Sequence, residues 1–196
     1  MPVLPLEPYV FPADLLANPT FPPLADSRWW VLHTRPRAEK CLARQFIDRA
    51  IPFFLPLYKR RWRCRGRMLC SHLPLFNGYI FLLGDAEARL DALKTNLVAR
   101  FLTVEDQEQL HADLVRVHHM MASGAPLAPE ERLKPGMLVQ ITSGPLAGLE
   151  GKISRRGNRL KLIVEVHFLQ RGASVEIEAW MVQSLGAEPR VAQVGA

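Results

Sequence analysis

Residues 29–39 read Trp-Trp-Val-Leu-His-Thr-Arg-Pro-Arg-Ala-Glu, and ordered structure begins abruptly with them. The first six residues are bulky or β-branched, a composition typical of a buried strand. Pro36 suits the first turn of a following helix, where its fixed φ fits and its missing N–H needs no partner. Beyond it, a stripe at helical spacing is expected to face a core: Ala38, Cys41, Leu42, Gln45 and Phe46. This stretch therefore predicts a strand followed directly by a helix.

The pattern after this unit predicts a single α+β domain over residues 28–122. Two extended runs flank a hairpin turn at Arg65-Gly66, and a central strand, a helix, a strand and a helix follow. Asp85 and Asp106 stand where they can cap the two helices. The order β-α-β-β-β-α-β-α predicts a ferredoxin-like antiparallel α/β sandwich of the split βαβ type, with one additional helix.

The remaining segments differ in composition from this domain. Residues 1–27 hold seven prolines and predict an extended or disordered tail. Residues 123–134 form a Pro/Ala-containing linker, and residues 135–186 alternate polar and apolar positions between glycine turns, which predicts a small β-barrel domain. Residues 187–196 are expected to be a C-terminal tail.

Positive charge is concentrated in one segment. Residues 28–70 contain twelve Lys/Arg and two acids, whereas the rest of the chain sums to −4, giving the net +6. So local an excess points to nucleic acid, with a merely solubilising surface as the alternative. One group of candidate nucleic-acid contacts lies at the start of the first helix: Arg35, Arg37, Lys40 and Arg44. The other surrounds the hairpin tip: Arg61, Trp62, Arg63, Arg65 and Arg67. Trp62 either stacks on an unpaired base or covers its own hairpin.

The sequence offers little support for catalysis or metal binding. Cys64, Cys70 and His72 supply only three ligands among repelling arginines, and a two-residue turn would put the cysteines on opposite faces, whereas a three-residue loop would not. His118 and His119 diverge on their helix and are expected at the surface. Phosphate-binding loops, nucleophile elbows and zinc-protease motifs are absent from the sequence. We therefore expect a cytoplasmic, monomeric non-enzyme without cofactor, metal site or membrane span.

Two motifs resemble the N-terminal domain of the NusG family of transcription factors. Residues 29–39 look like its opening strand and helix, and residues 75–81 (Leu-Phe-Asn-Gly-Tyr-Ile-Phe) resemble its Phe-Pro-Gly-Tyr signature, with Asn77 in place of proline. Residues 139–153 resemble a KOW motif, an element that also occurs in ribosomal proteins, and its turn residues are Gly144, Pro145, Gly148 and Gly151. Together these matches span residues 29–186.

The resemblance implies a transcription elongation or antitermination factor. Its first domain would bind the clamp helices of the largest subunit of bacterial RNA polymerase through an apolar depression and would touch upstream non-template DNA. Its SH3-like KOW barrel would recruit Rho, a small-subunit ribosomal protein or another partner. Carried onto this sequence, the depression comprises Phe76, Tyr79 and Phe81, with His33 and Phe101 beside them. The alternative is a ribosome-associated or other RNA-binding KOW protein.

The sequence leaves open whether the protein is a general factor or a specialised, RfaH-like paralogue. The Pro-rich tail, Asn77 and the very basic hairpin favour a specialised one. In RfaH the C-terminal domain can fold as a helical hairpin that masks the clamp site. Here Gly144, Gly148, Gly151 and Gly157 disfavour helix, and residues 160–168 alternate with period two, so we expect a barrel that is flexibly tethered and does not mask.

Overall fold

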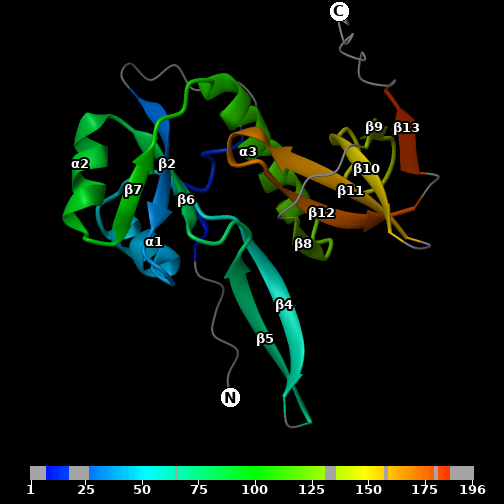
Figure 1. Ribbon diagram of the computed structural model, residues 1–196, viewed down its shortest axis with the longest axis horizontal. Helices are drawn as coiled ribbons and strands as arrows, with labels where there is room; N and C mark the ends of the chain where they lie inside the picture. The colour runs from blue at the N-terminus through cyan, green and yellow to red at the C-terminus, as the bar shows by residue number, and fades with distance from the viewer. Residues whose placement is uncertain are drawn as a thin grey trace, which may run out of the picture.

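The computed structural model describes residues 8–17, 27–64, 66–130, 136–156, 159–178 and 181–185 of the 196-residue chain. The first sheet has five antiparallel strands in the order β1 (Val10–Phe11), β3 (Phe53–Phe54), β6 (Tyr79–Gly84), β2 (Arg28–Thr34) and β7 (Val98–Leu102). Strand β6 thus lies between β2 and β3, which is the split βαβ arrangement (Figure 1). The predicted mixed α/β fold with antiparallel strands is confirmed, but the predicted element order is not: the first extended run of the hairpin is divided into β3 and a separate strand over residues 57–64, and β1 is additional.

Helices cover both faces of this sheet. Helices α1 (Glu39–Asp48) and α2 (Ala86–Lys94) pack on the face that carries Leu32, Ile80 and Leu82, whereas α3 (Gln107–Ala122) packs on the opposite face. The two predicted caps are confirmed, because the Asp85 carboxylate accepts from the amide of Ala88 at 2.9 Å and that of Asp106 from the amide of Gln109 at 2.8 Å.

A long hairpin projects from the body of the first domain (Figure 1). It consists of β4 (Leu57–Cys64) and β5 (Arg67–Pro74), which pair only with each other. Cys64 pairs with Arg67 and Arg61 with Cys70, so the two-residue turn is the one adopted. Cys64 and Cys70 consequently lie on opposite faces of the hairpin, because side chains alternate along a strand.

The C-terminal part is an antiparallel sheet of six strands. Their order is β13 (Val182–Ser184), β9 (Met137–Ile141), β10 (Glu150–Arg156), β11 (Arg159–Val166), β12 (Arg171–Ile177) and β8 (Leu127–Glu130), and a 3-10 turn, η1 (His167–Leu169), joins β11 to β12. The expected strand structure, rather than a helical hairpin, is confirmed. No pair of described residues joins β13 to β8, so the closed barrel is not confirmed.

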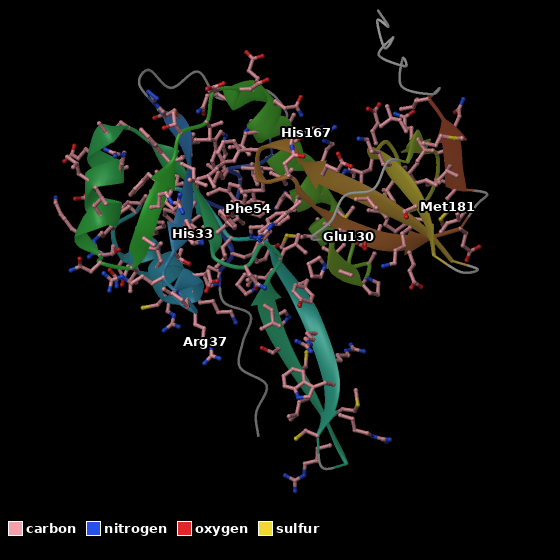
Figure 2. All side chains as sticks on the ribbon, in the orientation of Figure 1. His33, Arg37, Phe54, Glu130, His167 and Met181 are labelled. Atoms are coloured by element: carbon pink, nitrogen blue, oxygen red, sulfur yellow. The ribbon has the colours of Figure 1, made fainter. Side chains whose placement is uncertain are left out.

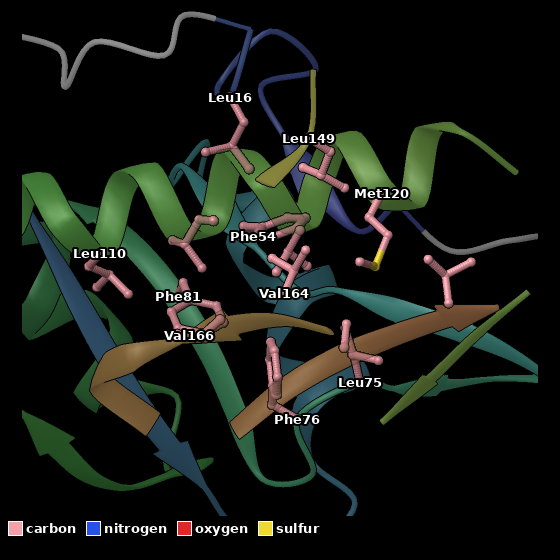
Figure 3. Close-up of a cluster of buried hydrophobic side chains, with 14 of the residues drawn as sticks. Leu16, Phe54, Leu75, Phe76, Phe81, Leu110, Met120, Leu149, Val164 and Val166 are labelled. Atoms are coloured by element: carbon pink, nitrogen blue, oxygen red, sulfur yellow. The ribbon is translucent and has the colours of Figure 1, made fainter. Parts of the chain in front are cut away.

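One hydrophobic core runs through both parts of the chain, with α3 between the two sheets (Figure 3). Val164 and Val166 of β11 belong to the same buried cluster as Phe54 and Phe81 of the first sheet. The expectation of a flexibly tethered, independent second domain is therefore wrong for this structure. The two parts share a core because α3 is apolar on more than one side and packs against both sheets.

Two segments predicted to lack structure contain strands. In the proline-rich tail, β1 pairs with the outer edge of β3, and Leu16 is buried in the shared core. In the predicted linker, β8 pairs with β12. Each segment satisfies backbone groups on an otherwise open sheet edge, which outweighs its local preference for irregular structure. Residues 1–7, 18–26 and 131–135, and the tail beyond residue 185, lie outside the described residues.

The first helix starts later than predicted. Residues 35–37 form a turn in which Arg37 has a φ of 62°, and α1 begins at Glu39. Glu39, Leu42, Ala43 and Phe46 face the core, whereas Cys41, predicted to be buried, is exposed. The buried face is centred on Leu42 and Phe46, as predicted, and Cys41 lies outside it.

Candidate polymerase and nucleic-acid interfaces

The two N-terminal motifs meet in space at the ends of β2 and β6. The amide of Thr34 donates to the carbonyl of Gly78 at 2.8 Å, and the amide of Gly78 donates to Oε1 of the buried Glu39 at 2.8 Å. The rings of His33 and Tyr79 lie 5.2 Å apart. Segments separated by some forty residues in the sequence therefore form one local structure.

The turn from Phe76 to Tyr79 carries the position where Asn77 replaces the family's proline. The amide of Tyr79 donates to the carbonyl of Phe76 at 3.1 Å, and Gly78 has a φ of 80°. A positive φ at the third position is the mark of a type II turn, which accepts proline at the second. A Cβ added to Gly78 would lie 3.3 Å from Nε2 of His33, so space as well as φ favours glycine. The turn hydrogen bond forms without the proline.

The structure separates the five residues predicted for the apolar depression. Phe76 and Phe81 are buried, with 1% and 0% of their surface exposed, and their rings pack edge to face. His33 and Tyr79 are half-buried neighbours. Phe101 pairs with Leu32, which places it on the opposite face of the sheet, against Trp30. Core packing thus explains Phe76 and Phe81, and Phe101 does not adjoin the others.

The second domain covers part of this surface. The guanidinium of Arg171 in β12 lies 5.3 Å from the centroid of the Tyr79 ring, within range of a cation–π contact. The sequence did not indicate this contact, because it joins two segments with unrelated motifs.

A buried carboxylate links α3 to the second domain. Asp113 has no exposed side-chain surface, and its Oδ2 accepts from the amide of His167 at 2.8 Å. The Nδ1 atom of His167 lies 3.1 Å from the same oxygen, and Gln109 and Arg116 contact the other oxygen. Every partner is a donor or can be one, so the charge is compensated inside the interface. No sequence motif marks Asp113, because its partner His167 lies 54 residues further along the chain.

The four basic residues predicted near the first helix are not one helical stripe. Arg35 and Arg37 are exposed in the turn before α1, and Lys40 and Arg44 lie one turn apart within it. Figure 2 shows Arg37 pointing outward from the edge of the first domain, whereas His33 lies within it. We call these four residues of the turn and the helix, Arg35, Arg37, Lys40 and Arg44, the basic rim.

The basic residues of the hairpin divide between its two faces. Arg61 and Arg63 lie on one face with Cys70 and Met68, and Trp62 lies on the other, paired with Leu69. Trp62 is 39% exposed and Leu69 is 37% exposed, so their contact leaves both in part accessible. Arg67 shares the face of Trp62, and Arg65 lies outside the described residues.

Two of the predicted turn glycines of the KOW-like segment, Gly144 and Gly148, lie between β9 and β10, whereas Gly151 lies within β10. Gly144 and Gly148 have φ values of 83° and 84°, and Pro145 lies in the turn between them. A Cβ on Gly151 would lie 2.5 Å from the carbonyl oxygen of Ile163, because β10 and β11 approach closely there. The segment therefore needs glycine at these places for backbone reasons.

Among the described residues there is neither a metal-binding cluster nor a membrane-spanning helix. No group of three His, Cys, Asp or Glu side chains is arranged to hold a metal ion within the described ranges. No described helix combines the length and apolar character needed to cross a membrane. His119 is exposed as expected, whereas His118 is partly buried and packs against the rings of Tyr9 and Phe54.

Comparison with known proteins assigns the first domain. No curated protein matches the chain. A solved structure titled "Domain interaction in Thermotoga maritima NusG" matches with a TM-score of 0.48 and 18% identity, over 82% of this chain and 98% of that one. The family model for NusG, described as transcription termination factor nusG, matches residues 27–117. This range contains both meeting motifs and the hairpin. Residues 27–117 are therefore identified as a domain of the NusG family of transcription factors.

Proposed function

We propose that this protein is a cytoplasmic elongation or antitermination factor whose first domain binds the clamp helices of the largest subunit of bacterial RNA polymerase. The observation that carries the proposal is the junction of the two motifs, where Glu39 and Gly78 hold a turn and the rings of His33 and Tyr79 lie side by side at a tilt. A rigid, half-buried aromatic pair in an apolar setting is typical of the anchors that dominate protein interfaces.

The same proposal assigns the basic rim and the hairpin to upstream non-template DNA. Arg35, Arg37, Lys40 and Arg44 supply phosphate contacts, and Trp62 with its neighbouring arginines supplies a stacking surface. Such contacts would hold the clamp closed and limit the strand movements that accompany pausing.

The second domain would recruit a further partner, Rho or a small-subunit ribosomal protein among the candidates, as a KOW domain of SH3-like barrel form. Because Arg171 lies over Tyr79, clamp binding would require this contact to open. The contact therefore favours a factor whose binding to polymerase is regulated, and it disfavours a factor that binds polymerase constitutively.

The test is binding of the full chain to a purified clamp-helix fragment. We expect Tyr79→Ala to weaken binding by at least about tenfold, as truncation of a central aromatic anchor does. Phe101→Ala is the matched control, since this aromatic lies on the opposite face of the same sheet. Equal binding by both variants would remove this surface from the proposal. Co-purification with ribosomes instead of polymerase would favour the RNA-binding alternative.

A further inference from the structure

A pocket of about 570 Å³ lies at the base of the hairpin. Its walls come from four parts of the chain: Tyr9 of the N-terminal segment, residues 57–61 of β4, His72 of β5, and the end of α3 with the residues leading into β8. More than half of its lining residues fall outside residues 27–117, so the family domain alone does not build it. Its volume is within the roughly 300–1,000 Å³ of ordinary ligand sites.

The charged groups of this pocket are all of one sign. Lys59 and His72 are cross-strand partners, and Arg61 follows Lys59 on the same face of the hairpin. The lining includes no Asp or Glu, and within the described part of the chain neither Lys59 nor Arg61 forms an ion pair with a carboxylate. Burial, then Lys59 and Lys40, lower the pKa of His72, which reflects the positive field at this wall. The site favours an anion.

The other walls are apolar or aromatic. Tyr9 is aromatic, and Leu57, Met121 and Leu127 are aliphatic, whereas Tyr58 borders the pocket from the hairpin face that carries Arg60. The backbone of Tyr9 is fixed, because its carbonyl accepts from the amide of Leu55 at 2.6 Å. A ligand that fills both parts must join a negative group to a flat apolar body.

We propose that this pocket binds one nucleotide unit, with its phosphate against Lys59, Arg61 and His72 and its base against Tyr9. The unit is either a free mononucleotide or one residue of a single strand. Binding of a residue within a strand rests on the proposed function, whereas binding of a free mononucleotide does not. A strand is geometrically suited, because Lys59, Arg61 and Arg63 repeat at about 7 Å along one face of β4 toward the hairpin tip.

The experiment titrates the full chain with dTMP, with AMP and with an oligothymidylate, following the His72 ring and the Tyr9 amide by NMR. Bound phosphate should raise the pKa of His72, because a nearby negative charge favours the imidazolium. Lys59→Ala/Arg61→Ala should weaken binding at least about tenfold, as loss of charge-assisted hydrogen bonds does. Arg60→Ala removes the same charge from the opposite face of the hairpin and should change binding less than about twofold.

The outcomes separate the sources and the two proposals. Saturable shifts at His72 and Tyr9 with mononucleotides assign a free nucleotide, and shifts with the oligonucleotide alone assign a strand. If no probe moves these signals, or if Arg60→Ala is as harmful as the double variant, the pocket is not a nucleotide site. In that case DNA binding that still depends on Arg37, Lys40 and Arg44 would leave the proposed function intact.

Discussion

The carboxylate of Glu39 accepts a hydrogen bond of 2.8 Å from the amide of Gly78, 39 positions further along the chain. Glu39 is 7% exposed and opens α1, whereas Gly78 ends the turn before β6. The bond ties the first helix to the turn that presents Tyr79. This hydrogen bond explains structurally why the first motif ends in an acidic residue, Glu39, which the sequence alone did not explain.

Replacing Glu39 should therefore destabilise the first domain. Glu39→Ala leaves a sequestered N–H without an acceptor, which costs about 1–3 kcal/mol in the free energy of unfolding, whereas Glu39→Gln keeps an acceptor oxygen and should lose less. Urea denaturation of both variants measures this. Glu87→Ala is the matched control, because Glu87 has the same place in the first turn of α2 but is exposed. A loss no larger than that of the control would show that the bond contributes nothing.

Asn77→Pro should stabilise the turn that Glu39 supports. Asn77 is exposed and precedes Gly78, whose φ of 80° suits the third position of a type II turn. Proline at the second position restricts the unfolded chain and should add about 0.4–1 kcal/mol. The urea midpoint should rise while the Tyr79 amide keeps its protection from hydrogen exchange. A lower midpoint would mean that the turn needs a backbone angle that proline does not allow.

Local patterns predicted most of the first domain, and contacts between distant segments account for what they missed. Asp85 and Asp106 were identifiable as caps because capping depends on residues only three positions away. Phe101 was misplaced because its face of the sheet is set by pairing with Leu32, a contact between distant segments that no local pattern specifies.

The interdomain contacts were beyond prediction for a similar reason. Asp113, His167 and Arg171 belong to no motif, and each appears ordinary in its own element. Only the packing of β11 against α3 brings His167 to Asp113 and Arg171 to Tyr79. The alternation of β11 predicted a strand correctly but carried no information about which helix would cover it.

Removing the buried carboxylate should loosen the two domains. Asp113→Ala deprives the His167 amide and Arg116 of their acceptor, so the interface should open more often. NMR relaxation should then give separate tumbling times for the two sheets, where the native chain tumbles as one body. Asp91→Ala is the matched control, because Asp91 pairs with Lys94 at the same helical spacing on the surface. Unchanged tumbling in Asp113→Ala would assign the interface to its apolar contacts alone.

The stability of the fold should decrease as the pH falls, in part through His118. Burial, and to a smaller degree His119, lower the pKa of His118 below its ordinary 6.5. The unfolded chain then binds the proton more readily than the folded one. The contribution of His118 is therefore fully present above about pH 6.5 and is lost as the pH falls through the lowered pKa.

His118→Phe tests this directly, since a phenyl ring retains packing against Tyr9 and Phe54 but carries no titratable group. The urea midpoint of the native chain should drop between about pH 7.5 and pH 5.5, and the drop should be smaller in the variant. His119→Gln removes only the lesser cause and should keep most of the dependence. His72, whose pKa is also lowered, titrates in the same direction, so a residual slope is expected. An identical slope in His118→Phe and the native chain would show that His118 takes its proton equally well in the folded and unfolded states.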